Sequence, residues 1–253
     1  MTVFEAITLL VAGVWAGTIN TVVGSGTLIT FPVLLAFGVS PVTANVSNTI
    51  GLVPGSLSGA WGYRDELAGQ RGRILRLGSA AVAGGTAGAA LLLVLPSSAF
   101  DAIVPALIAL GVGLVILGPR ISSRVAARAA TRGGLPEHGA AWVWAAVAGA
   151  GVYGGYFGAA QGVLLLAILG IGVADTLQRH NAVKNVLAAL INGVAALIFM
   201  VVADVDWAIA GLIAAGAIVG GQLGAKIGRR LPANVLRGVI VVVGVAALIS
   251  FLL

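Results

Sequence analysis

The sequence has 253 residues, of which 59% are hydrophobic and only 9% are charged. Because soluble domains carry about 25% charged residues, this composition excludes an ordinary soluble protein and predicts an all-α polytopic membrane protein in the lipid bilayer. The net charge of +6 fits basic cytoplasmic loops better than a nucleic-acid partner, and the lack of cysteine excludes disulfides and cysteine-ligated metals. We expect no metal, no cofactor and no enzyme activity.

The first 40 residues are apolar but are interrupted near their middle. Residues 22–27 read VVGSGT, and only about a dozen mostly apolar residues separate them from Gly38. At ~1.5 Å per residue, this second half is too short to cross a hydrocarbon layer of ~30 Å. We therefore expect a broken or re-entrant helix pair that turns near the bilayer midplane and restarts at Thr27. The segment lacks the basic start of a signal peptide and is expected to remain in the mature protein.

Three uninterrupted apolar spans follow, at about residues 42–62, 74–95 and 99–118. A basic linker, residues 119–140, then joins a first repeat (residues 1–118) to a second repeat (residues 141–253). The repeats align in one gapless register with a shift of 136 residues, the separation of Asn45 and Asn181. This register also superimposes Gly26 on Gly162, Gly84-Gly85 on Gly220-Gly221 and Leu95-Pro96 on Leu231-Pro232. Internal repeats of this kind are typical of secondary transporters.

The distribution of charge indicates that the two repeats have inverted topology. Basic residues concentrate in residues 64–76, in the linker and in residues 226–237, and the positive-inside rule places all three in the cytoplasm. The register pairs the first and third of these with residues 200–207 and 93–101, which carry no basic residue. Equivalent loops therefore lie on opposite sides of the membrane, and both termini are expected outside.

The second repeat is interrupted at residues 157–163 (FGAAQGV), where we expect a restart at Val163 and a return that ends near Val173. Each repeat then has three full transmembrane helices plus one broken pair, giving 8–10 membrane segments. Non-helical backbone at membrane depth is tolerated only where it is buried or lines a watery cavity, and restarting half-helices direct free N–H groups at an anion. The alternative is that these glycines only permit close helix crossing, which is what we expect of Gly13/Gly17, Gly151/Gly155 and Gly220/Gly224.

Lys184 lies nine residues beyond Asp175, about halfway into a membrane helix at a depth of ~13 Å. A charge near the bilayer centre costs about 2.5–3.5 kcal/mol, so it normally faces a cavity or a partner; the alternative is a stem that snorkels back to the interface. Asp175 and Arg179 have i,i+4 spacing and are expected to pair at that interface.

Two polar patches, at residues 45–48 and 180–185, predict a two-sided pocket, although Asn45 and Asn181 are equally suited to link helices. The predicted substrate-binding residues are Lys184, Asn181, Asn185, Asn45, Asn48, Ser25, Gly24, Gly26, Thr27, Gln161, Gly162 and His180. No nucleotide-binding loop and no deep carboxylate is present, which argues against ATP-driven transport and a carboxylate proton relay. A secondary transporter remains, with an anion channel or a non-transporting membrane sensor or scaffold subunit as alternatives.

Residues 17–64 resemble the first-repeat signature of the TauE/SafE sulfite exporter family, and residues 151–199 resemble its second-repeat signature, including N-A-x-K-N at residues 181–185. The resemblance covers nearly the whole chain. It implies a multi-pass protein of the prokaryotic plasma membrane that exports a small sulfur-containing anion, such as sulfite, sulfoacetate or another organosulfonate. From the inverted repeats we expect alternating access around a midplane site. Many members have three or four glycines at the first break, whereas this chain has Ser25 and Thr27, whose hydroxyls are expected to tune substrate choice. A homodimer is an open alternative for its assembly.

Overall fold

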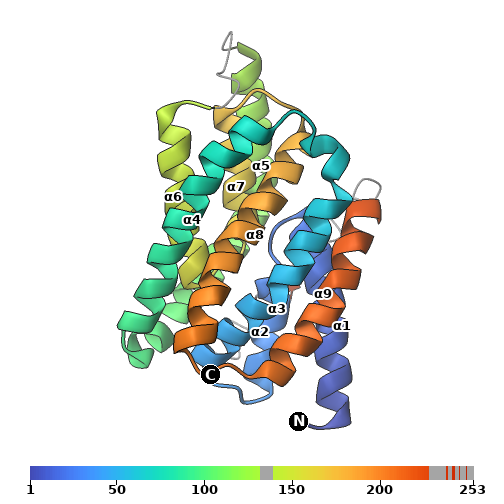
Figure 1. The fold of residues 1–253 in the computed structure, drawn as a ribbon, viewed down its shortest axis with the longest axis vertical. Coiled ribbons are helices and arrows are strands. Elements are labelled where there is room, and N and C mark those ends of the chain that lie inside the picture. Colours follow the sequence, from blue (N-terminus) through green and yellow to red (C-terminus); the bar gives the residue numbers. More distant parts are fainter. Residues whose placement is uncertain (132–138, 228–237, 239–240, 243–244, 246–248, 250–253) are drawn as a thin grey trace.

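The computed structural model describes residues 1–131 and 139–227, together with positions 238, 241, 242, 245 and 249. Within this part of the chain the protein is all-helical, as predicted, with nine α-helices and the 3-10 turn η1 (Arg64–Leu67) but no strand. The helices, labelled in Figure 1, are α1 (Val3–Val22), α2 (Thr27–Ala36), α3 (Pro41–Gly62), α4 (Arg71–Val94), α5 (Ser97–Thr131), α6 (Ala141–Tyr156), α7 (Gln161–Gly172), α8 (Leu177–Val202) and α9 (Trp207–Ile227).

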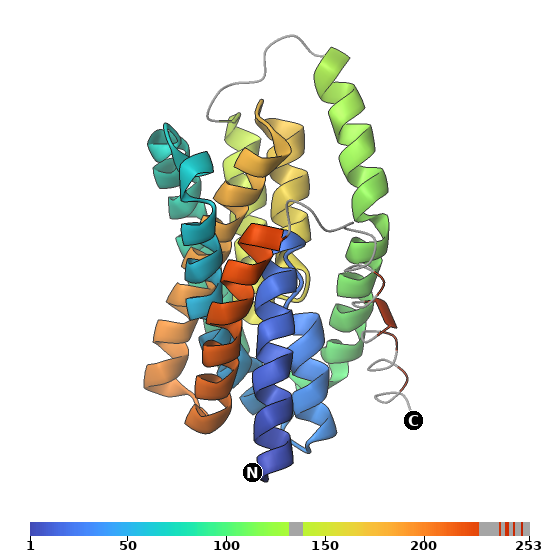
Figure 2. The same cartoon turned by 90° about the vertical axis from the view of Figure 1, so that its right-hand side faces the viewer.

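Five of the described helices are long and apolar enough to cross a membrane: α1, α4, α5 over Ser97–Leu117, α8 and α9. The shorter apolar helices are α2 and α7, the second halves of the two expected broken pairs. The three spans predicted for the first repeat correspond to the helices α3, α4 and α5, of which α4 and α5 are among the five that are long and apolar enough to cross a membrane. Helix α5 continues without a break to Thr131, through the first part of the predicted linker, and its end projects beyond the other helices (Figure 2). The boundaries of the two repeats stay a prediction.

Small residues bring neighbouring helices into backbone contact. A Cβ added at Gly17 of α1 would lie 2.4 Å from the carbonyl oxygen of Ala217 in α9, and one added at Gly155 of α6 would lie 2.3 Å from that of Gly85 in α4. Neither space admits a methyl group without movement of the backbone. The expectation of packing glycines is confirmed, because all the members of the predicted pairs are in such contacts: Gly13, Gly17, Gly151, Gly155, Gly220 and Gly224.

Helices from the two predicted repeats are interleaved. Helix α1 packs along α9, α6 packs along α4, and both α3 and α4 contact α8. The first helix of each predicted repeat therefore lies against a helix of the other, and the two interruptions that follow α1 and α6 come together inside the bundle.

Two glycines of α6 provide a matched test of this packing. Gly155→Ala should lower the free energy of unfolding by about 1–3 kcal/mol, because the added methyl group meets the Gly85 carbonyl. Gly149→Ala is the control: it lies on the same helix with no atom within 4 Å of its added Cβ, and alanine is the better helix former. Thermal melting of the detergent-solubilised protein measures both; equal melting temperatures for the two variants would contradict the packing.

Candidate functional site

The two interruptions are tight backbone turns, at residues 23–26 between α1 and α2 and at residues 157–160 between α6 and α7. Gly24 turns the first with φ +91°, and the second uses Gly158 (φ +76°) and Ala160 (φ 59°). The restart at Thr27 is confirmed. The expected restart at Val163 is wrong: the two left-handed residues complete the reversal by residue 160, so α7 begins at Gln161 and Gly162 lies inside it.

The two turns touch each other. The N–H of Gly162 donates to the carbonyl oxygen of Gly24 at 3.0 Å, and a Cβ added at Gly24 would lie 2.4 Å from the Gly162 Cα. Phe31 of α2 also packs edge-on against Phe157 of the second turn, with ring centroids 5.0 Å apart. Glycine is therefore sterically required at Gly24 and Gly162, and the two breaks pack directly against each other.

Lys184 points into this structure. Its side chain is fully buried, and its Nζ donates to the carbonyl oxygens of Asn20 and Thr21, each at 2.9 Å. These carbonyls belong to the last turn of α1, which ends at Val22 and leaves them without intrahelical partners. The lysine stem also packs on Gly162, since its Cδ lies 3.1 Å from a Cβ added there. The side chain thus turns into the bundle and does not snorkel.

Asparagines complete the capping of both broken helices. Asn181 and Asn185 of α8 donate from Nδ2 to the Thr21 carbonyl, at 3.1 and 3.4 Å. Asn45 of α3 caps the other broken helix in the same way: it donates at 2.9 Å to the carbonyl of Tyr156, the last residue of α6. A helix of each predicted repeat therefore caps the broken helix of the other, and Asn45 and Asn181 do link helices.

Asn48 aligns with Lys184 in the repeat register but contacts a different element. It donates to Thr27 Oγ1 at 3.3 Å and accepts from Thr30 Oγ1, so it holds the start of α2. In the same turn, the N–H groups of Ser25, Gly26 and Thr27 meet no acceptor within the described residues, and the Ser25 hydroxyl is buried without a partner.

At the start of α7, in contrast to α2, the first N–H groups all have acceptors. Its N–H groups at Gln161, Gly162 and Val163 donate to the carbonyls of Gly158, Gly24 and Ala160, at 3.2, 3.0 and 3.0 Å. The Gln161 side chain turns back between α6 and α8, with Oε1 against Gly154 and Nε2 donating to Asn192 at 3.4 Å. Of the two half-helices α2 and α7, only α2 therefore has unpaired N–H groups at its N-terminus.

Thr30 and Asn192 form hydrogen bonds with the predicted site residues Asn48 and Gln161 but were missed from the sequence. Each is a single polar residue in an apolar run, and such residues are common in membrane helices. The repeat register carried a signal for Asn192, because it aligns with Ser56, and Ser56 accepts a hydrogen bond from Asn20 at 3.1 Å next to the first break. No comparable signal marked Thr30.

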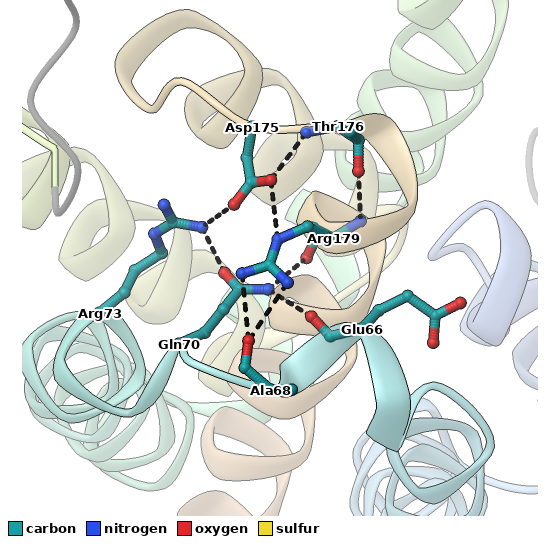
Figure 3. A network of polar contacts seen from close by, with 7 residues as sticks. All are labelled: Glu66, Ala68, Gln70, Arg73, Asp175, Thr176 and Arg179. Carbon is teal, nitrogen blue, oxygen red and sulfur yellow. Dashed lines mark hydrogen bonds and ion pairs between the residues drawn. The ribbon is translucent and has the colours of Figure 1, made fainter.

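A charged network joins the two predicted repeats at the start of α8 (Figure 3). Asp175 lies between two arginines, 2.6 Å from Arg73 of α4 and 2.8 Å from Arg179, which confirms the expected i,i+4 pair. Arg179 also donates to the carbonyl of Ala68 at 3.2 Å. His180, predicted as a site residue, is buried beside this network and interacts electrostatically with Asp175 and Arg73; no hydrogen bond joins it to either break within the described residues.

The comparisons with known proteins agree on one family. The family model described as "Sulfite exporter TauE/SafE" matches residues 9–251. The protein named "Probable membrane transporter protein YfcA" of Escherichia coli K12 is 27% identical over 232 residues, which cover 90% of this chain and 82% of the relative. The proteins of the same name in strains CFT073 and O157:H7 match equally well. No solved structure matches. With the five long apolar helices, these matches confirm an integral membrane protein with several spans.

The Asp175 network generates a prediction about pH. Partial burial acts to raise the pKa of Asp175, but hydrogen bonds from Arg73, the Thr176 N–H and Arg179 outweigh it and hold that pKa below its usual value. A carboxyl whose pKa is lowered by folding stabilises the protein above its unfolded pKa of about 4 and loses that contribution as the pH falls through the folded value.

Asp175→Asn should therefore destabilise the protein by about 3 kcal/mol near neutral pH, because it removes the carboxylate that pairs with both the buried Arg73 and Arg179. The difference in melting temperature from the wild type should shrink in acid, below pH ~4. Asp65→Asn is the control, since Asp65 is 81% exposed. A constant difference across this range would show that the ionised carboxylate is not what stabilises the contact.

Proposed function

Because the chain belongs to the sulfite exporter TauE/SafE family of membrane transporters, we propose that it is a secondary carrier for a small sulfur-containing anion. Sulfite, sulfoacetate and other organosulfonates are the substrates proposed. The two predicted repeats, residues 1–118 and 141–253, are proposed to have inverted topology and to provide alternating access to the paired breaks. Export is the proposed direction.

The observation that carries the proposal is the burial of the Lys184 amino group among neutral partners. Its ammonium group is fully buried, its hydrogen-bond partners are two neutral carbonyls, and no carboxylate pairs with it within the described residues. A buried charge without a counter-charge is costly and is normally paired or bound to a ligand. An anion at the break would supply the missing charge.

The donors around the breaks support an anion as the ligand. Lys184 provides charge on one side, and the open N-terminus of α2, with Ser25, Gly26 and Thr27, provides hydrogen bonds and the positive end of a helix dipole. Asn181 and Asn185 hold the end of α1 next to the lysine. Gly24 and Gly162 bring the two breaks close enough to act together.

The exchange of caps between repeats supports alternating access. Asn45 of the first repeat caps α6 of the second, while Asn181 of the second caps α1 of the first. A relative movement of the two repeats would change both caps at once, whereas the Gly24–Gly162 contact lies at the junction between them. Such a movement can expose the break alternately to the two sides without dismantling either helix pair.

Replacement of Lys184 tests the proposal. Lys184→Gln retains a donor for the Asn20 and Thr21 carbonyls but removes the charge, and Lys184→Ala removes both. In proteoliposomes, both variants should reduce saturable sulfite or sulfoacetate counterflow to the level of empty vesicles, and purified protein should lose stabilisation by these anions. Lys226→Ala, at the exposed end of α9, is the matched control.

Membrane insertion and monodispersity should be unchanged in Lys184→Gln. Normal counterflow by that variant would contradict the role of the charge. Currents without saturation or counterflow would instead identify an anion channel, and failure of the wild type to bind or move any sulfur anion would favour a scaffold subunit.

A further inference from the structure

The amino group of Lys184 has two hydrogen-bond partners in the part of the chain that the structure describes. Its Nζ donates to the carbonyl oxygens of Asn20 and Thr21, each at 2.9 Å. An ammonium group has three N–H donors, whereas a neutral amine has two. The two carbonyls therefore use every donor of a neutral amine and leave one N–H of an ammonium without a partner.

The surroundings of this amino group supply no full negative charge. Lys184 is fully buried, and no ion pair among the described residues includes it. Thr21 Oγ1 and Asn181 Oδ1 are buried without a hydrogen bond, but these oxygens are neutral, so a shift of the amine toward them would add a bond and no charge. The end of α1 offers roughly half a negative charge through its helix dipole. An ammonium is thus only partly compensated here when no anion is present.

A buried amine in such surroundings removes the uncompensated charge when it releases a proton. Burial of an isolated charge costs far more than burial of the same group in its neutral form, and buried ionisable groups neutralise for that reason. An anion reverses this balance, because it provides the counter-charge and an acceptor for the third N–H. The empty site therefore favours the amine, and the loaded site favours the ammonium.

We propose that Lys184 carries the coupling proton of the transporter: it is a neutral amine in the empty site and takes up one proton when an anion binds, so that anion and proton cross the membrane together. This inference rests on the proposed function and adds the coupling ion to it. The proton comes from water on the side to which the site is open and is released with the anion on the other side. A monovalent anion then crosses as a neutral pair, and export requires an anion gradient that exceeds any opposing proton gradient.

Other titratable groups lie around α8, but within the described residues none is bonded to the Lys184 amine. His180 precedes Lys184 by about one helical turn and is buried beside the network of Asp175, Arg73 and Arg179. Helices α3 and α7 carry no titratable residue. The other titratable residues on elements that contact α8 are Glu5 of α1, Tyr63 before η1, Arg64, Asp65 and Glu66 of η1, Arg71 and Arg76 of α4, Tyr153 and Tyr156 of α6, and Lys226 of α9. His180 is therefore the competing proton acceptor that an experiment must separate from Lys184.

Lysine-selective NMR tests the proposal directly, because Lys184 and Lys226 are the only lysines in the sequence. The full-length protein in detergent, isotopically labelled at lysine Cε, gives one signal for each, and the Cε shift distinguishes an ammonium from an amine; Lys226→Arg assigns the signals. At about pH 8, below the ordinary lysine pKa of about 10.4, the exposed Lys226 should be an ammonium throughout. Lys184 should have the shift of an amine without ligand and that of an ammonium once methanesulfonate is bound.

The Lys184 signal reports the protonation of the amine and not of the ligand, so sulfite and sulfoacetate serve equally well as the added anion. An ammonium signal without ligand would overturn the proposal, as would an amine signal that no bound anion shifts. The variant His180→Gln separates the competing acceptor. Its Lys184 signal should still respond to the anion, and loss of that response with anion binding retained would overturn the assignment of the proton to Lys184.

Proteoliposomes show whether the proton moves with the anion. Without a membrane potential, an imposed pH gradient should concentrate methanesulfonate on the alkaline side by about tenfold per pH unit, for one proton per anion. A membrane potential without a pH gradient should not concentrate it, because the pair is neutral; vesicles without protein are the control. Accumulation driven by the potential alone would overturn the coupling and leave an anion carrier or channel. Failure of any sulfur anion to bind or move would overturn the proposed carrier function as well.

Discussion

The structure depends on how a helix that ends inside a bundle satisfies its last carbonyl groups. Helix α1 ends at Val22 between two buried neighbours, Thr21 and Val23, and side chains supply donors to its last carbonyls. Lys184, Asn181 and Asn185 share one face of α8 at i, i+3 and i+4 spacing and direct three donors to that end. The N-A-V-K-N segment is thus first a helix cap, and this capping role fixes the lysine beside the break.

Capping alone does not balance the lysine charge. The C-terminal end of a helix carries roughly half a negative charge, so the α1 dipole compensates about half of the ammonium. A neutral donor such as asparagine would satisfy the α1 carbonyls without burying a cation. Asn45 does this for the last carbonyl of α6. The excess positive charge at α1, next to the free N–H groups at the start of α2, is the feature for which we propose an anionic ligand in addition to the capping role.

The hydrophobic pattern and the repeat register predicted the helical class, the two breaks and a Lys184 side chain that faces a partner inside the protein, because each depends on backbone periodicity and on the cost of burying charge. They could not predict side-chain reach. Asn48 and Lys184 occupy equivalent positions, yet the short amide stops at Thr27 of its own repeat, while the longer amine crosses to α1. The second restart was misplaced because Ala160 adopts a left-handed conformation that alanine rarely takes, so no glycine marked it.

The asymmetry between the two breaks follows from one backbone contact. The carbonyl of Gly24 accepts from the N–H of Gly162 and so satisfies one of the first N–H groups of α7. The carbonyl of Ala160 instead accepts from Val163 and Leu164 of its own helix, so it provides no acceptor for the N–H groups at the start of α2. Two related turns that meet in this way leave one open N-terminus and one unpaired cation. Two predicted repeats can therefore surround a single site, and we propose that the donors at the first break bind one anion per chain.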